Sequence, residues 1–121
     1  MENMTRVFIA AMSVCVLLQS QVALSTNYVV GDSSGWFFGV SAWPNGKTFK
    51  AGDVLEFKYD VTMHSVVEVG KSDYESCNIP SDATTYNSGD DKITLSNGTS
   101  YFVCGFPGHC AAGMKIAITA N

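Results

Sequence analysis

Three side chains that can bind a metal lie in one short stretch, CGFPGHCAAGM. They are the thiol of Cys104, the imidazole of His109 and the thioether of Met114, with four residues between each and the next. A thiolate, an imidazole and a thioether are the soft and borderline donors preferred by a copper ion that cycles between two oxidation states. The spacing therefore predicts a copper-binding loop, with electron transfer as its chemistry.

A further donor has to come from elsewhere in the chain. A trigonal copper site of this kind uses two imidazoles, one thiolate and a long axial thioether. The only other histidine is His64, which begins the apolar, β-branched run HSVVEV. We expect it at the end of one strand, facing the loop that follows another. The predicted ligands are therefore His64, Cys104, His109 and Met114.

Each of these residues also has an ordinary structural interpretation. A lone methionine near a C-terminal strand usually packs in the core, and a lone histidine on an apolar run is usually a hydrogen-bonded structural residue. Zinc could take the two imidazoles and the thiolate, but a structural zinc site normally adds a thiolate or a harder donor instead of a thioether. The combination of two imidazoles, one thiol and one thioether at this spacing favours copper.

The first 25 residues have the features of a secretory signal peptide. Arg6 precedes the apolar stretch VFIAAMSVCVLL, and Ala23 and Ser25 supply small residues before a cleavage site at Thr26. The apolar run is too short for a membrane span, which needs roughly 20 residues. We expect residues 1–25 to be removed, leaving residues 26–121 as one secreted domain.

Cleavage would remove Cys15 and leave three cysteines. An odd count in a secreted domain implies one thiol that is unpaired or otherwise occupied. If Cys104 binds the metal, Cys77 and Cys110 remain to form a disulfide that ties the ligand loop to the body of the fold. The alternative, a disulfide between Cys104 and either of the other two, would destroy the metal site.

Charge and composition narrow the class of protein. The chain has 7 Lys and Arg against 11 Asp and Glu, a net charge of −4, and its lysines are scattered singly. Nucleic-acid binding is therefore not expected.

The triplet Asn97–Gly98–Thr99 is an acceptor for N-glycosylation, and we expect Asn97 to carry a glycan in a turn far from the metal.

Short runs rich in β-branched and aromatic residues alternate with turn-forming residues, which predicts an all-β sandwich. A short helix is expected around Asp73–Cys77. In VLEFKY the alternation places Val54, Glu56 and Lys58 on a solvated face. The expected strands are Tyr28–Val30, Thr48–Lys50, Val54–Tyr59, His64–Val69, Lys92–Leu95, Thr99–Cys104 and Met114–Thr119.

Four motifs, YVVGDSSGW, FKAGDVLEFKY, HSVVEV and YFVCGFPGHCAAGMKIAI, resemble those of the phytocyanins, the plant blue copper proteins, and most closely the plantacyanin (basic blue protein) branch. The resemblance covers essentially the whole mature chain. The chain departs from that branch in its acidic charge and in Ser65, where Asn is common.

This resemblance implies a cupredoxin-like Greek-key β-sandwich with a mononuclear copper site at one end. It implies one copper ion as cofactor, a disulfide between Cys77 and Cys110, and an extracellular location in the apoplast or cell wall. Met114 separates the chain from the stellacyanin branch, which has Gln at this position. The ligands that it implies are His64, Cys104, His109 and Met114.

The favoured function is that of a secreted one-electron carrier and not of an enzyme. Both histidines are claimed by the metal, so no Ser/His/acid set can form. A copper oxidase is disfavoured because four filled ligand positions leave no open site for a substrate. The alternative is an extracellular signalling or cell-wall interaction module in which copper is structural and the surface, including Trp36 and Trp43, does the work.

The partner should be a redox protein that docks near His109. The Gly, Pro and Ala residues around His109 give its ring little cover, whereas His64 begins a strand that should be packed. We therefore expect the His109 edge to be the better exposed and to serve as the entry point for electrons. We also expect a monomer without a membrane anchor, because neither a Pro-rich segment nor a hydrophobic tail follows Met114.

Overall fold

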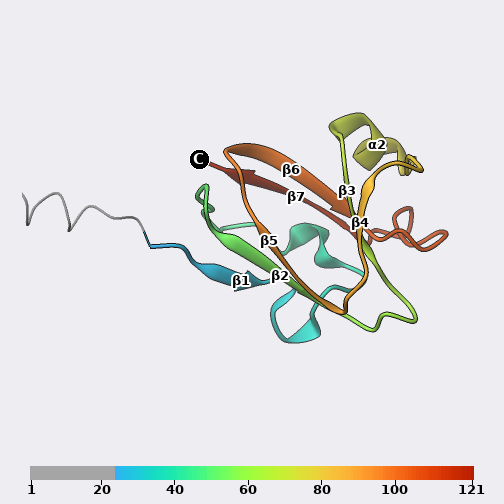
Figure 1. The fold of residues 1–121 in the computed structure, drawn as a ribbon, viewed down its shortest axis with the longest axis horizontal. Helices are drawn as coiled ribbons and strands as arrows, with labels where there is room; N and C mark the ends of the chain where they lie inside the picture. The colour runs from blue at the N-terminus through green and yellow to red at the C-terminus, as the bar shows by residue number, and fades with distance from the viewer. Residues whose placement is uncertain (1–23) are drawn as a thin grey trace, which may run out of the picture.

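Two β-sheets pack face to face across residues 24–121, the part of the chain that this computed structural model describes (Figure 1). The all-β sandwich predicted from the sequence is thus confirmed. The expected signal peptide lies almost wholly outside the described residues, and its removal stays a prediction. None of the helices within residues 24–121 has the length and apolar character that a membrane span requires.

The first sheet has the strand order β1-β2-β5. Strand β1 (Asn27–Val29) runs parallel to β2 (Val54–Lys58), and β5 (Asp90–Thr94) pairs antiparallel with the other side of β2. The chain passes to the second sheet after β2, returns for β5 and crosses again to β6. The chain therefore crosses between the two sheets three times, from β2 to β3, from β4 to β5 and from β5 to β6.

The second sheet is antiparallel, with the order β4-β3-β6-β7. Its strands are β3 (Val66–Val69), β4 (Thr84–Tyr86), β6 (Gly98–Val103) and β7 (Lys115–Ala120). The ligand loop joins β6 to β7. Figure 1 shows this loop at one end of the sandwich and the turn between β5 and β6 at the opposite end.

The core between the sheets is built from strand positions that alternate inward. Phe57 of β2 packs against Phe102 of β6, with ring centroids 5.2 Å apart, and Trp36 meets Phe57 edge-on at 5.1 Å. Ile116 and Ile118 of β7 are fully buried in the same cluster. Truncating one of these aromatic residues to Ala should cost about 3–5 kcal/mol, as is usual for buried Phe or Trp.

A second, smaller apolar cluster lies on the outer face of the second sheet. Helix α2 (Lys71–Ser76) contributes Tyr74 to it, and the sheet contributes Val67 and Val103. The same cluster contains Cys77 and Cys110, which form a disulfide. The predicted pairing of these two cysteines is confirmed, and Cys104 is the free, buried cysteine of the described residues.

Several boundaries differ from the sequence prediction. The segment Thr48–Lys50 makes a single bridge, from Phe49 to Ala120, because the carboxylate of Asp53 accepts the Lys50 N–H and draws the chain into a turn. Strand β4 was not predicted, since it is a short, polar edge strand after Pro80. The helix begins two residues before its expected start at Asp73.

The prediction that Glu56 lies on a solvated face of β2 is wrong. This residue is buried because β2 is the central strand of its sheet and Asn27 of the neighbouring β1 covers it. The Asn27 Nδ2 atom donates a hydrogen bond of 3.0 Å to Glu56 Oε1. The covered carboxylate is therefore partnered.

Candidate metal centre

Three of the predicted donors converge at the end of the sandwich where the ligand loop lies. The Nδ1 atoms of His64 and His109 are 3.2 Å apart. The Sγ atom of Cys104 lies 3.4 Å from Nδ1 of His109 and 3.8 Å from Nδ1 of His64. Residues that are 40 and 45 positions apart in the chain are therefore brought together as expected.

The spacing of these atoms fits a metal ion. Three atoms with such separations all lie about 2 Å from the centre of the circle through them, which is a typical metal–nitrogen bond length. A neutral imidazole pair with one thiolate is the equatorial set of a blue copper site. The donors present thus fit one copper ion, and the geometry agrees with the sequence prediction.

The ligand loop is closed by two backbone hydrogen bonds. The N–H of Cys104 donates to the carbonyl of Met114 at 3.0 Å, and the N–H of Met114 donates to the carbonyl of His109 at 3.0 Å. Met114 is fully buried in the main core cluster and directly precedes β7. Its place beside Cys104 agrees with an axial thioether, and its role as a ligand stays a prediction.

His64 is fixed by a turn and not by a strand, because β3 begins only at Val66. The N–H of His64 and that of Met63 both donate to the carbonyl of Asp60, at 3.0 and 3.1 Å. The carboxylate of Asp60 in turn accepts bonds from the backbone and the hydroxyl of Thr62. The imidazole is therefore held by a hydrogen-bonded turn at the edge of the sheet.

Ser65 ties the two ligand segments together. Its carbonyl accepts a hydrogen bond of 2.9 Å from the buried indole Nε1 of Trp36, and its hydroxyl accepts one of 3.1 Å from the N–H of Gly105. A Cβ atom on Gly105 would lie 2.7 Å from the Ser65 hydroxyl, so only glycine allows this close approach. Ser65, which stands where Asn is common in the family, thus makes a hydrogen bond across the site.

The environment of His64 favours the neutral imidazole, which is the form that binds a metal. Burial lowers the pKa of His64 below its ordinary value, and the charge of His109 lowers it further, against an opposite effect of Asp60. Its Nε2 atom has no hydrogen-bond partner among residues 24–121. An imidazole held at Nδ1 by the metal agrees with this arrangement.

Exposure differs between the two imidazoles in the predicted direction. His64 is only 2% exposed, whereas His109 is half-buried. Pro107, Gly108, Ala111 and Ala112 around His109 are exposed. The prediction that the His109 ring is the more accessible one is confirmed.

Three phenylalanines lie beside the imidazoles, and two of them, Phe37 and Phe38, were missed by the sequence prediction. Phe38 lies edge-on to His109 at 4.9 Å and to His64 at 5.8 Å, and Phe37 lies edge-on to His64 at 5.5 Å. Phe106 stacks on His109 at 5.9 Å. The only signal in the sequence for Phe37 and Phe38 was their position directly after Trp36, because their contacts with the histidines cross more than 20 residues of chain.

Comparisons with known proteins agree with this site. A family model described as a plastocyanin-like domain matches residues 36–114. The chemocyanin of Lilium longiflorum is 53% identical over 107 residues, 88% of this chain and 85% of that protein. The basic blue protein of Cucumis sativus is 54% identical over 93 residues, 77% of this chain and 97% of that protein. The chain belongs to the phytocyanin family.

Comparison with solved structures supports the same family through the fold. The structure of cucumber basic protein, a blue copper protein, matches with a TM-score of 0.78 and 52% identity, over 79% of this chain and all of that one. Spinach plantacyanin matches with a TM-score of 0.66 and 52% identity, over 72% of this chain and 94% of that one. The cupredoxin-like class and the likeness to plantacyanins are thereby confirmed.

The predicted glycan acceptor lies far from this centre. Asn97 is exposed in the turn between β5 and β6, at the end of the sandwich opposite the ligand loop (Figure 1). Attachment of a glycan at Asn97 stays a prediction.

Proposed function

We propose that this protein is a secreted carrier of single electrons that holds one copper ion between His64, Cys104, His109 and Met114. The observation that carries the proposal is the convergence of two imidazole nitrogens and one thiol sulfur within 3.8 Å of one another. Copper, when bound, supplies a centre that alternates between two oxidation states.

The residues around the site contribute rigidity. The Asp60 turn fixes His64, the backbone bonds of Met114 close the ligand loop, and the disulfide of Cys110 anchors the residue after His109. A donor set held this firmly changes little when the charge at the site changes, so the cost of rearranging it during electron transfer is small. Such a closed, rigid site supports electron transfer. It does not support turnover of a bound substrate.

Accessibility supports an exchange of electrons through His109. Its ring is half-buried in an exposed loop, whereas His64 is covered. A redox partner docking at this end would be separated from the metal centre by the imidazole ring of His109 alone. Secretion is supported by the signal-peptide features of residues 1–25 and by the disulfide, which is typical of oxidising compartments.

The alternative of a signalling or cell-wall module is weakened by the position of Trp36. Its side chain is 1% exposed and donates to the Ser65 carbonyl, so it supports the metal centre instead of offering a surface for binding. Trp43 is half-buried. A copper-free variant that keeps the full biological activity would favour this alternative over electron transfer.

The visible spectrum tests the proposal directly. The copper(II) form should be intensely blue because of the thiolate at Cys104, and Cys104→Ser should abolish the colour while the domain stays folded by circular dichroism. A colourless copper-loaded wild type, or a variant of equal colour, would refute the assignment. Reversible one-electron voltammetry of the wild type completes the test.

A further inference from the structure

Large apolar side chains are exposed at one place beside the metal centre. The exposed fractions are 46% for Phe37, 38% for Phe38, 48% for Val61 and 51% for Met63. Within residues 24–121 the only other exposed large apolar side chain is Leu24, the first residue described. We call the four residues around the centre the apolar face.

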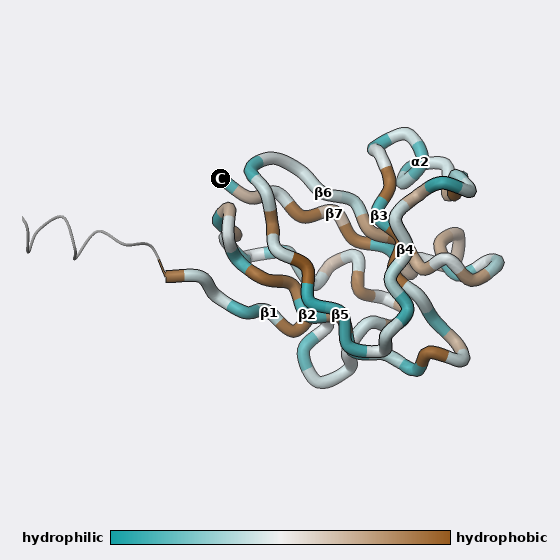
Figure 2. The backbone as a smooth tube through the Cα atoms, viewed as in Figure 1, coloured by the Kyte–Doolittle hydropathy of each residue, from teal (hydrophilic) through white to brown (hydrophobic). Residues whose placement is uncertain are grey.

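These four residues belong to two segments that meet at the histidines. Phe37 and Phe38 contact each other edge-on at 5.3 Å and both contact His64, and Met63 directly precedes His64. Val61 lies in the same loop before β3, which runs at the lower right of Figure 2 and is partly coloured as apolar. Exposing this surface is unfavourable by about 25 cal/mol per Å² unless a partner covers it.

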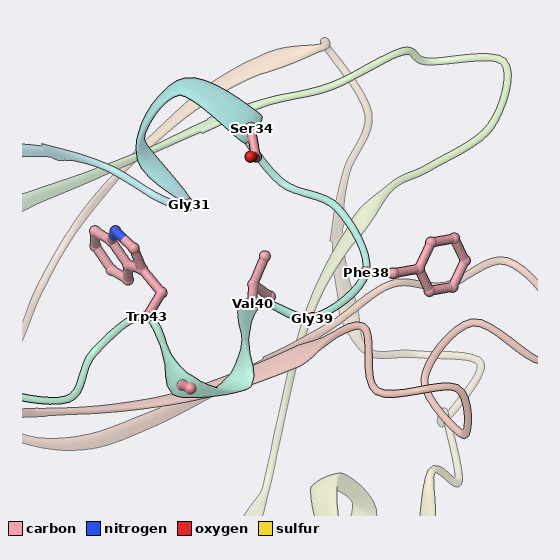
Figure 3. Close-up of a pocket in the computed structure, with 7 residues that line it drawn as sticks. Gly31, Ser34, Phe38, Gly39, Val40 and Trp43 are labelled. Carbon is pink, nitrogen blue, oxygen red and sulfur yellow. The ribbon is translucent and has the colours of Figure 1, made fainter.

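Phe38 has a special place on this face, since it alone contacts both imidazoles. It lies 4.9 Å from the His109 ring and 5.8 Å from the His64 ring, whereas Phe37 contacts only His64. A pocket of about 350 Å³ lies between the turns η1 (Asp32–Ser34) and η2 (Val40–Ala42). Phe38 lies at the edge of this pocket, and Figure 3 shows its ring directed away from Val40 and Trp43. The ring contacts the two imidazoles instead.

The charges beside the apolar face have one sign. The three segments that surround the centre, residues 31–43, 59–65 and 104–114, contain Asp32 and Asp60 but no lysine or arginine. The lysines next to these segments are turned to other partners. They are Lys47, bonded to the Trp43 carbonyl, Lys58, 4.0 Å from Glu56, and Lys115, bonded to the Tyr74 carbonyl.

We propose that Phe37, Phe38, Val61 and Met63 form the docking surface for a redox protein whose contact area is apolar and whose rim carries lysine or arginine. The ring of Phe38 is the contact through which the electron passes between the partner and the imidazoles. The docking area thus extends from the His109 edge across His64. The electron route and the redox nature of the partner rest on the proposed function, while the use of the apolar face for docking does not.

The choice of partner follows from the complementarity of the two surfaces. An apolar area buried on docking supplies affinity, and attraction between the acidic rim and a cationic partner raises the rate of encounter. An anionic partner would be repelled by Asp60 and by the net charge of −4. A second copy of this chain would bring two acidic rims together and is disfavoured for the same reason.

Docking is tested by nuclear magnetic resonance on the copper(I) protein, repeated without copper. The inert paramagnetic probe tris(1,10-phenanthroline)chromium(III) is cationic with aromatic faces, and it should broaden the signals of the four residues but not that of Thr119, at the far end of β7. Hexaamminechromium(III), equally charged but hydrophilic, should broaden them less, and hexacyanochromate(III) should have no effect. Broadening centred elsewhere, or line widths that grow with protein concentration alone, would overturn the docking surface.

The route is tested by oxidising the copper(I) protein with tris(1,10-phenanthroline)cobalt(III), which takes up one electron as cobalt(III) becomes cobalt(II). Phe38→Ala should lower the rate constant about tenfold, as the loss of a contact hot spot does, and the matched Phe37→Ala by much less. Phe38→Leu, which keeps the apolar volume, should retain docking in the resonance test but stay slow. Asp60→Asn should weaken the dependence of the rate on salt.

The outcomes separate the two claims. Equal slowing by Phe37→Ala and Phe38→Ala would overturn the route through Phe38. A protein that binds no copper would refute the proposed function, yet the resonance test without copper would still decide the docking surface. Thr119→Ala should leave every rate unchanged.

Discussion

The hydroxyl of Ser65 accepts a hydrogen bond from the backbone N–H of Gly105, and this 3.1 Å contact links the residue after His64 to the residue after Cys104. Two ligands that lie 40 residues apart are thereby held in a fixed relation. The bond is partly buried, so neither partner can be satisfied fully by water when the other is removed.

Ser65→Ala should therefore loosen the metal centre. Leaving the Gly105 N–H unpaired should lower the free energy of unfolding of the copper-free protein by about 1–3 kcal/mol, measured by urea titration. Copper should also dissociate faster into a chelator. Ser41→Ala is the matched control, because its hydroxyl bonds carbonyls of Gly113 and Lys115 at the exposed surface and should cost less. Equal losses in both variants would show that Ser65 has no special role.

The disulfide between Cys77 and Cys110 should contribute to stability and to the order of the ligand loop. Cys77→Ala should lower the free energy of unfolding by about 2–5 kcal/mol, as is usual for small secreted domains. Because Cys110 follows His109, the variant should also release copper faster. The double variant Cys77→Ala, Cys110→Ala is the control that removes the stray thiol. Unchanged stability in both variants would contradict this prediction.

A buried network around Tyr59 should make the protein sensitive to alkaline pH. The Tyr59 hydroxyl donates to the buried carboxylate of Asp91, and burial together with this bond raises its pKa from 10.0 to about 12. Between these two values the unfolded chain loses its proton while the folded protein keeps it. The free energy of unfolding should therefore fall as pH rises from 10 to about 12.

Tyr59→Phe tests this network. The variant should be less stable by about 1–3 kcal/mol at neutral pH, since Asp91 loses a hydrogen bond. It should also lose the part of the alkaline decline that Tyr59 causes. Thermal unfolding of both proteins from pH 8 to 11 provides the comparison, and identical alkaline slopes would show that Tyr59 does not titrate as described.

The metal centre was largely predictable from the sequence because its information is local. Cys104, His109 and Met114 lie in one loop, the chain has a single further histidine, and the odd number of cysteines after cleavage indicates one thiol outside a disulfide. The contacts of Phe38 with both imidazoles were not predictable, since they depend on the path of the loop between η1 and η2.

The fold shows the same division between local and long-range information. Alternation marks β2, β6 and β7, whose cores are apolar, but it says nothing of β4, which is polar and stabilised by pairing with β3. Burial of Glu56 escaped prediction because it depends on the strand that lies beside it. Sequence periodicity reports a residue's own preference, whereas these features belong to neighbours far along the chain.

The last prediction concerns Met114, whose thioether is a weak donor. An amide oxygen is harder and favours copper(II) over copper(I), so Met114→Gln should lower the reduction potential while the blue colour is retained. For one electron, each tenfold change in the ratio of the affinities for the two oxidation states shifts the potential by about 59 mV. Met114→Leu, which keeps the buried volume without a donor atom, is the matched control and should shift the potential in the opposite direction. If voltammetry finds the Gln and Leu variants at the wild-type potential, Met114 contributes to packing alone and the centre has three ligands.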